Sequence, residues 1–354
     1  MTTTPSRADQ PTDAWSSNTT PANIAEWLST GQSIAILTHA RPDGDAIGST
    51  TAVARALNQA TKTKRARIYY TGGMPRWADD IIQDTPHTHV DASTPPADFN
   101  PDRILVVDTG SWSQLDALGE LVKERAADTA IVDHHLSGNA EIADRRLLAT
   151  SAAAACEPIS EICQHILSAD TPSKLPTSVA TPLYLGLATD TGWFKFSNVK
   201  PSTLRLAACL IEAGVDHAAL HVLIELNESP ARLRIVAKAL ASLDLIDRDR
   251  IAIMTITTED AHAAHAGPSD TGGLSNYPLS IGTVRVAATI TQVETVDPEP
   301  AAKISLRSKP GPNMIDVNEV AKKLGGGGHA NAAGAKLACS VEEAKARLIK
   351  ALTQ

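Results

Sequence analysis

The sequence lacks the patterns that mark several common functional classes. Its four cysteines, Cys156, Cys163, Cys209 and Cys339, form no Cys-x-x-Cys pair and show no zinc-knuckle spacing. They therefore predict reduced core residues, not a disulfide framework or a thiolate zinc site. No apolar run reaches the ~18 residues of a membrane span, and the N-terminus has no apolar signal-peptide core. We expect a cytoplasmic protein with no membrane partner.

The sequence also lacks an excess of basic residues. Its 40 Asp and Glu residues outnumber 32 Lys and Arg residues, which gives a formal net charge of −8. Binding along duplex DNA needs a broad basic face, so this balance argues against duplex DNA but leaves small anionic substrates open. With 43% hydrophobic and 20% charged residues, the 354-residue chain has an ordinary globular composition and room for one or two domains.

From residue 33 onward, short apolar runs rich in β-branched residues alternate with helix-like stretches, as in parallel β-α units. A helix predicted over 229–246 begins with Ser-Pro. Beyond it, three apolar runs, a glycine run and a last helical pattern predict a second α/β unit. The predicted strands cover 33–37, 66–71, 103–108 and 129–133, and then 250–256, 284–290 and 302–308.

These patterns predict an α/β protein with a parallel-sheet domain, a smaller α/β domain and a cleft between them. Residues 1–22, rich in Thr, Ser and Pro, are expected to be a disordered tail. We assign residues 23–228 to the first domain, 229–248 to a linker helix and 249–354 to the second domain.

Carboxylates and imidazoles follow several of the apolar segments. The stretch "HARPDGD" follows the first strand, although Asp and Gly alone would also fit an ordinary turn. We expect four such segments to end at one rim of the sheet, where α/β folds bind ligands. They supply His39, Asp43 and Asp45; then Asp108; then Asp133, His134 and His135; and finally Asp190, which ends "LYLGLATD".

This set of side chains predicts divalent metal ions. A lone Asp after a strand is usually a helix cap or turn residue, so the prediction depends on the four segments together. Several carboxylates in one crevice repel one another unless cations hold them. An Asp-rich set that contains histidine suits Mn²⁺ or Mg²⁺ better than a metal selected by thiolates.

The glycine run "GGGGH", Gly325 to His329, lies in a basic stretch of this acidic chain. Residues 303–336 carry a local net charge of +4. A flexible turn would also explain the glycines, and the run lacks the spacing of a dinucleotide fingerprint. We interpret it as a place where a nucleotide approaches the backbone closely, with His329 and Arg307 reaching phosphate oxygens.

In this order, "HARPDGDAIGS", "VVDTG", "VDHH" and "TDTGWFKFSN" resemble the DHH phosphoesterase family. The later "ISLRSKP" and "GGGGHANAAGA" resemble its DHH-associated C-terminal domain. The set is similar to the standalone branch of nanoRNases and 3′-phosphoadenosine-5′-phosphate (pAp) phosphatases, which also includes pApA and cyclic di-AMP hydrolases. The resemblance runs from about residue 23 to the C-terminus.

The resemblance implies two Mn²⁺ ions per subunit, with Mg²⁺ or Co²⁺ as substitutes. It implies one ion on His39, Asp43 and Asp108, and a second on Asp45, Asp108, His134 and Asp190, with Asp108 bridging. Asp133 would orient a histidine, and His135 could donate to the scissile phosphate, which makes these the predicted catalytic residues. Predicted substrate contacts are Ser305, Arg307, Gly326, Gly327, Gly328 and His329.

The implied activity is hydrolysis of phosphoester bonds in short oligoribonucleotides, pAp, pApA or cyclic di-AMP by a metal-activated water. The partners would be short RNA or small phosphorylated nucleotides, and a homodimer would suit the family. The enzymatic alternative is a family II-type inorganic pyrophosphatase or polyphosphatase, which would carry a Ser-Arg-Lys type motif where this chain has "SLRSK". The non-enzymatic alternative, a nucleotide-binding regulatory module, would have lost a ligand, whereas all six positions are intact.

Overall fold

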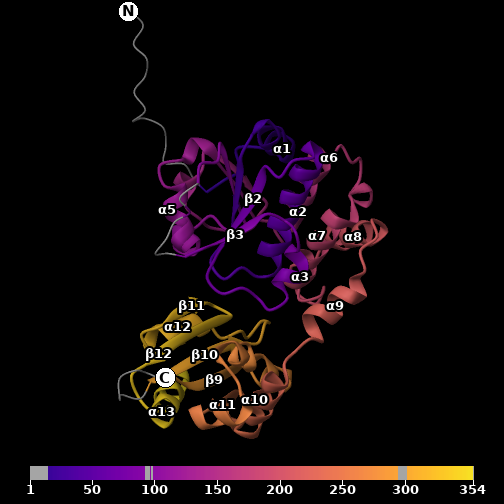
Figure 1. Cartoon of the computed structure of the whole chain (residues 1–354). Helices are drawn as coiled ribbons and strands as arrows, with labels where there is room; N and C mark the ends of the chain where they lie inside the picture. Colours follow the sequence, from indigo (N-terminus) through magenta and orange to yellow (C-terminus); the bar gives the residue numbers. More distant parts are fainter. Residues whose placement is uncertain (1–14, 92–95, 97–98, 294–300, 354) are drawn as a thin grey trace, which may run out of the picture. The chain divides into compact units, whose positions relative to one another are not determined.

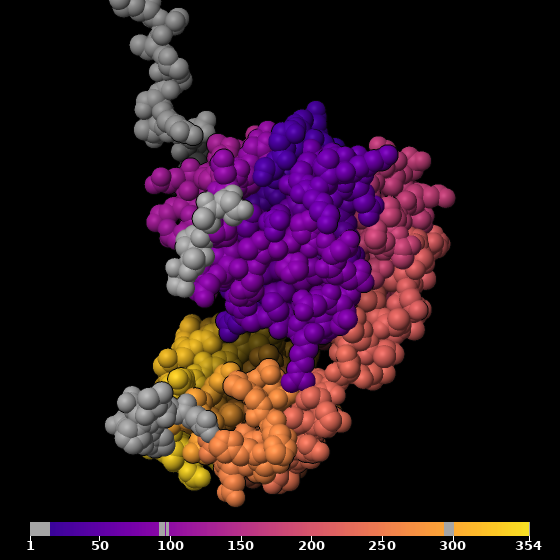
Figure 2. Space-filling model, viewed as in Figure 1, coloured from indigo at the N-terminus to yellow at the C-terminus, as the bar shows by residue number. Residues whose placement is uncertain are grey.

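The computed structural model describes residues 15–91, 96, 99–293 and 301–353. The chain forms two compact units, of which the first ends at Leu226 and the second begins at Asn227. In Figure 2, each unit is one continuous stretch of chain, indigo to salmon for the first and orange to yellow for the second. Each has its own sheet and its own core. The cleft expected between them stays a prediction.

The first unit is a parallel sheet in the order β3-β2-β1-β4-β5-β6, with helices on both faces (Figure 1). Its strands are β1 (Ile34–Leu37), β2 (Ala66–Thr71), β3 (His87–Val90), β4 (Arg103–Val107), β5 (Thr129–Asp133) and β6 (Arg145–Leu148). Its helices are α1 (Pro21–Thr30), α2 (Gly44–Thr61), α3 (Ala78–Ile82), α4 (Trp112–Leu115), α5 (Gly119–Val122), α6 (Cys156–Leu167), α7 (Thr177–Asp190), α8 (Pro201–Glu212) and α9 (His217–Glu225). Short 3-10 helices are η2 (Asp116–Leu118), η3 (Ala126–Asp128), η4 (Ala140–Ile142) and η5 (Pro172–Lys174).

Alternation along the strands divides the core of this unit between the two faces of the sheet. In β1, Ile34 and Ile36 pack toward α1, α2, α6 and α7, whereas Ala35 and Leu37 pack toward α4 and α5. Because both faces are covered, the central strands are apolar throughout. The strand order changes direction between β1 and β4, and open α/β sheets bind ligands at the carboxyl ends of the strands at such a point.

The second unit is a mixed sheet in the order β11-β12-β10-β9-β8-β7; among its described strands, β8 and β9 pair in parallel and the other neighbours pair antiparallel. Helices α12 and α13 cover one face, and α10 and α11 pack against the other at β8. The strands are β7 (Asp244–Ile246), β8 (Ile251–Ile256), β9 (Val286–Val293), β10 (Ala301–Ser308), β11 (Gly327–His329) and β12 (Ala332–Leu337). The helices are α10 (Pro230–Ala241), α11 (Thr258–Ala264), α12 (Val317–Lys323) and α13 (Val341–Thr353), with 3-10 helices η6 (Pro268–Thr271) and η7 (Leu274–Ser280).

The predicted α/β class and each of the seven predicted strands are confirmed. The helix predicted over 229–246 is too long, because it ends at Ala241 and Asp244–Ile246 pairs antiparallel with β8 as strand β7. Nor is this helix a linker over 229–248. Its Ile235 and Val236 pack against Met254 of β8, so α10 is part of the second unit.

The tail predicted over residues 1–22 lies outside the described residues as far as residue 14. From Trp15 the chain runs beside β6, the edge strand of the first sheet. The Asn18 amide donates to the Arg146 carbonyl at 2.9 Å, and the Arg146 amide donates back to Asn18 Oδ1 at 2.8 Å. Helix α1 then begins at Pro21, so the folded unit starts before residue 23.

The prediction of core cysteines holds for three of the four. All four are free; Cys156, Cys163 and Cys339 are buried, whereas Cys209 is only half-buried. Among the described helices, no single one is both long and apolar enough to cross a bilayer. Helices α8 and α9 meet that condition only when taken together, as a pair bent by 107°.

Candidate active site

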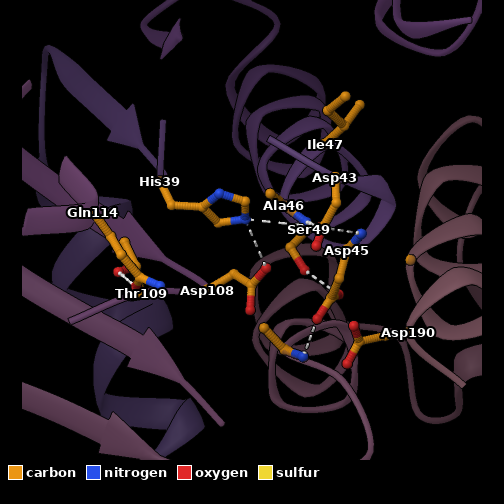
Figure 3. A network of polar contacts seen from close by, with 12 residues as sticks. His39, Asp43, Asp45, Ala46, Ile47, Ser49, Asp108, Thr109, Gln114 and Asp190 are labelled. Atoms are coloured by element: carbon orange, nitrogen blue, oxygen red, sulfur yellow. Dashed lines mark hydrogen bonds and ion pairs between the residues drawn. The ribbon is translucent and has the colours of Figure 1, made fainter. Parts of the chain in front are cut away.

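The loop between β1 and α2 presents a histidine and a helix-capping carboxylate. Asp43 is the N-cap of α2, and its Oδ1 accepts hydrogen bonds from the amides of Asp45 and Ala46, both at 3.1 Å. This is a favoured role for Asp, and it fixes the carboxylate. The amide of Ala40 donates to the Gln114 carbonyl at 2.7 Å, which holds the loop from the other side. His39 Nε2 then lies 3.8 Å from Asp43 Oδ1 (Figure 3).

Asp108, directly after β4, is at the centre of the site. It has a φ of 62°, a left-handed conformation that Asp tolerates better than most residues, and its side chain is almost fully buried. Its Oδ2 lies 3.5 Å from His39 Nε2, and its Oδ1 lies 3.3 Å from His134 Nε2. Within the described part of the chain, Oδ1 accepts no hydrogen bond. Burying a carboxylate oxygen without a donor is costly, and a bound cation would remove that cost.

His134, after β5, connects Asp108 to two further carboxylates. Its Nε2 lies 4.0 Å from Asp45 Oδ2 and 3.6 Å from Asp190 Oδ2. Asp190, which ends the apolar segment "LYLGLATD", is the last residue of helix α7. Helices α2 and α7 cross closely at Gly48, where a Cβ would collide with the backbone of α7. This close crossing brings the Asp45 end of α2 beside Asp190.

Asp45 has partners that the sequence analysis missed. Its carboxylate accepts hydrogen bonds from the amides of Ala155 at 2.5 Å and Cys156 at 3.0 Å, where α6 begins, and from Ser49 Oγ at 3.1 Å. A helix N-terminus favours a negative charge, so these donors stabilise and orient the carboxylate. Because every residue type except proline supplies a backbone N–H donor, residue identity does not reveal these partners. The small residues of "SAAAAC" were the one available signal of them.

Asp133 and His135 form a second pair beside the cluster. The buried Asp133 Oδ1 accepts hydrogen bonds from the amides of His134 and His135, at 2.7 and 3.2 Å, and lies 2.7 Å from His135 Nδ1. An ionised carboxylate can only accept, so Nδ1 carries a proton and is not free for Asp108, 4.0 Å away. This hydrogen bond also raises the pKa of His135. The half-exposed ring therefore has Nε2 left to face a ligand.

The acidic cluster binds protons tightly. Burial lowers the pKa of His39 and His134, but their contacts with Asp108 and other carboxylates outweigh burial and raise both values to about 10. Burial, with neighbouring carboxylates, raises the pKa of Asp190 to about 6 and that of Asp45 well above its usual range. The carboxylates therefore resist being charged together, and a cation that binds here must displace protons.

Three groups in this cluster have the composition and spacing of metal-ligand sets. In each, three ligand atoms lie within 4.8 Å of one another; the groups are His39, Asp43 and Asp108; Asp45, His134 and Asp190; and Asp108, His134 and His135. The first group has the residues of one predicted set, and the second has those of the other apart from Asp108, which contacts His134. Four carboxylates would balance the charge of two divalent ions, and oxygen and imidazole ligands suit Mn²⁺, Mg²⁺ or Co²⁺. The residues present therefore fit a pair of divalent ions.

The predicted substrate-binding residues lie together on the second sheet. Arg307 of β10 and His329 of β11 both pair with Ala332 of β12, and Ser305 and Gly327 both pair with Gly334. Directly paired residues point to the same face, so Ser305, Arg307 and His329 share the face opposite α12 and α13, which α10 and α11 cover only at β8. Neighbouring strands are about 4.8 Å apart, which places the Arg307 and His329 backbones about 10 Å apart.

The glycines of this region allow β11 to lie close to β12. A Cβ at Gly326 would collide with the Gly334 carbonyl, and one at Gly328, whose φ is 152°, would collide with the backbone of β12. The glycine run is therefore part of a strand pair and not a free turn. It leaves an open, small-residue surface beside Arg307 and His329. Lys303 and Lys336, which pair with each other, add two cations to the same face.

Comparison with known proteins adds independent information. The profile described as "DHH family, N-terminal domain" matches residues 33–187, and the DHHA1 domain profile matches residues 218–354. The chain is 28% identical to the bifunctional oligoribonuclease and PAP phosphatase NrnA of Thermus thermophilus, over 91% of this chain and 89% of that protein. It is 25% identical to the protein of the same description from Mycoplasma pneumoniae, over 89% and 91%. An exopolyphosphatase-related protein from Bacteroides fragilis superposes with a TM-score of 0.83 at 24% identity, over 94% and 95%, which supports the fold alone.

Proposed function

We propose that this chain, which carries a DHH-family domain and a DHHA1 domain, is a Mn²⁺-dependent phosphoesterase that hydrolyses short oligoribonucleotides and pAp. The observation that carries the proposal is the pair of metal-type ligand groups that meet at Asp108. The similar proteins named oligoribonuclease and PAP phosphatase support the choice of substrate. We extend the proposal to pApA and cyclic di-AMP, which present the same phosphoester and adenosine chemistry.

In this proposal His39, Asp43 and Asp108 would hold one divalent ion, and Asp45, His134 and Asp190, with Asp108, would hold the other. Two such ions, when bound, lower the pKa of a water and stabilise the entering and leaving oxygens of an in-line displacement at phosphorus. The role of the chain is to fix the ligands. Asp43 is held as a helix cap, and Asp45 by the start of α6.

His135 acts on the substrate. Asp133 fixes the Nδ1–H tautomer at 2.7 Å and stabilises the doubly protonated ring. The exposed Nε2–H is then available to donate to a phosphate oxygen, whose negative charge increases in the transition state. Asp133 itself is buried and orients His135 without contacting the substrate. In the second unit, Arg307 and His329 bind a phosphate and the glycine strand accepts the nucleotide.

Removing metal tests this proposal. Exhaustive chelation is expected to abolish hydrolysis of pAp, and Mn²⁺ is expected to restore it better than Mg²⁺ or Co²⁺.

The metal concentration that gives half-maximal activity should fall as the pH rises from about 6 to about 8. The reason is that His39 and His134, with pKa values raised to about 10, must lose protons to bind a cation. Undiminished hydrolysis by the chelated protein would contradict the proposal.

A further inference from the structure

Trp15 lies beside the two loops that carry the central residues of the site. Its indole is partly buried and packs on the core that also contains Leu37 and Val106. The ring occupies the space that side chains would take at Gly110, two residues after Asp108, and at Gly138, three residues after His135. A Cβ at either glycine would collide with the ring, so both loops are shaped around the indole.

The Trp15 side chain also forms a hydrogen bond to the loop that carries His135. The indole Nε1–H of Trp15 donates to the carbonyl of His135 at 3.1 Å. The two loops are also joined to each other, because the Asn139 amide donates to the Gly110 carbonyl at 2.6 Å and Asn139 Oδ1 accepts from the Trp112 amide at 3.3 Å. Trp15 therefore contacts both members of a connected pair of loops.

The segment that carries Trp15 is anchored at the edge of the sheet. Ser17 Oγ donates to the Leu148 carbonyl at 3.1 Å and accepts from the Leu148 amide at 2.7 Å, and Asn18 exchanges two hydrogen bonds with Arg146. Four hydrogen bonds to β6 thus fix the backbone just after Trp15. The DHH profile begins to match at residue 33, so this segment lies before the matched range.

We propose that Trp15 is a positioning residue, which fixes the loops after β4 and β5 so that His135 and Asp108 keep their separation. Only the kinetic test of this proposal depends on the proposed function. Because Trp15 contacts both loops and the carbonyl of His135, it constrains the orientation of the loops. Small misplacements of reacting groups cost up to ~100-fold in rate. Substrate binding in the second unit does not depend on Trp15, so the effect should fall on kcat and not on KM.

Kinetics of Trp15→Ala, Trp15→Phe and Asn18→Ala on pAp test the proposal. Trp15→Ala should lower kcat at least ~10-fold with KM changed less than ~3-fold, because the loops lose their spacer. Trp15→Phe keeps a ring between the glycines and loses one neutral hydrogen bond, so it should lose only ~2- to 10-fold. Asn18→Ala removes the side-chain hydrogen bonds to the Arg146 amide and the Asp144 carbonyl but keeps the indole, the Asn18 backbone bond and both Ser17 bonds, so it should lower Tm and leave kcat within ~2-fold.

Hydrogen–deuterium exchange gives a readout that needs no substrate. The amides of residues 109–114 and 134–139 should exchange faster in Trp15→Ala than in the unsubstituted protein, and should be unchanged in Asn18→Ala. A Trp15→Ala kcat within ~2-fold of the unsubstituted protein, or an equal loss in Asn18→Ala, would overturn the proposal. If the unsubstituted protein hydrolysed no nucleotide, the proposed function would fail. Exchange would then decide the role of Trp15, with unchanged loop amides refuting it.

Discussion

Replacement of Asp108 with asparagine is expected to lower kcat on pAp by at least ~1,000-fold while the fold is retained. Asp108 is the side chain placed to serve both ligand groups, with its two oxygens 3.5 Å from His39 and 3.3 Å from His134. An amide removes one negative charge and one oxygen ligand from that position. Metal activation contributes several kcal/mol, and ~4 kcal/mol corresponds to ~1,000-fold. The measurement is kcat at saturating Mn²⁺, with bound metal determined by elemental analysis.

The matched control for this substitution is Asp128→Asn. Asp128 is in η3, before β5, at the opposite end of the strand from His134, and it pairs with Arg125 at 3.2 Å. The same change of an acid to an amide there should leave kcat within ~2-fold, because exposed ion pairs contribute little. An Asp108→Asn variant that kept half of the unsubstituted kcat would show that Asp108 does not bridge two ions.

Arg307→Ala and His329→Ala are each expected to lower kcat/KM on pApA by ~10- to 100-fold and to leave bound metal unchanged. A charged hydrogen bond to phosphate is worth ~1.5–3 kcal/mol, which sets that range. Both residues lie on the face of the second sheet opposite α12 and α13; His329 is exposed and Arg307 is half-buried, so their loss should disturb the fold little. Bis-p-nitrophenyl phosphate, which lacks a nucleotide, should be affected much less.

Arg347→Ala is the control for this pair. It removes the same charge from the same unit, but Arg347 is on α13, which covers the other face of the sheet, and pairs with Glu343 at 2.5 Å. Its kcat/KM on pApA should stay within ~2-fold. Equal losses of activity on pApA and the generic ester, or loss of bound metal, would show that Arg307 and His329 do not bind the nucleotide.

The sequence was most informative where chemistry and position coincide in a short motif. His39, Asp43, Asp108 and His134 follow short apolar strands whose order along the chain predicts a parallel sheet, and parallel strands bring their carboxyl ends to one rim. Asp190, which was expected at the same rim, ends helix α7 and not a strand. A buried run such as "LYLGLATD" has the same apolar pattern in a strand as in a core helix, and periodicity alone does not separate the two.

What the sequence did not reveal depends on contacts between distant segments. The donors to Asp45 are backbone amides more than 100 residues away, and amides are the same for every residue type. The residues of strand β7 were included in the predicted helix because their apolar pattern continues that of the helix. Their pairing with β8 is visible only in the sheet. Trp15 lies in a stretch with the composition of a disordered tail. The Trp15 indole and the hydrogen bonds of Ser17 and Asn18 are enough to fix this stretch. The composition of a segment does not reveal so few contacts.

The claim that this chain is a nucleotide phosphoesterase is tested most directly by substrate ranking. Metal-free protein reconstituted with Mn²⁺ would be assayed for kcat/KM on pAp, pApA, cyclic di-AMP, RNAs of two to six nucleotides, and pyrophosphate. Our account predicts that pAp, pApA and the shortest RNAs lead, with pyrophosphate at least ~100-fold lower because it offers no nucleoside to the glycine strand. Pyrophosphate as the leading substrate, or no hydrolysis of any nucleotide, would contradict it.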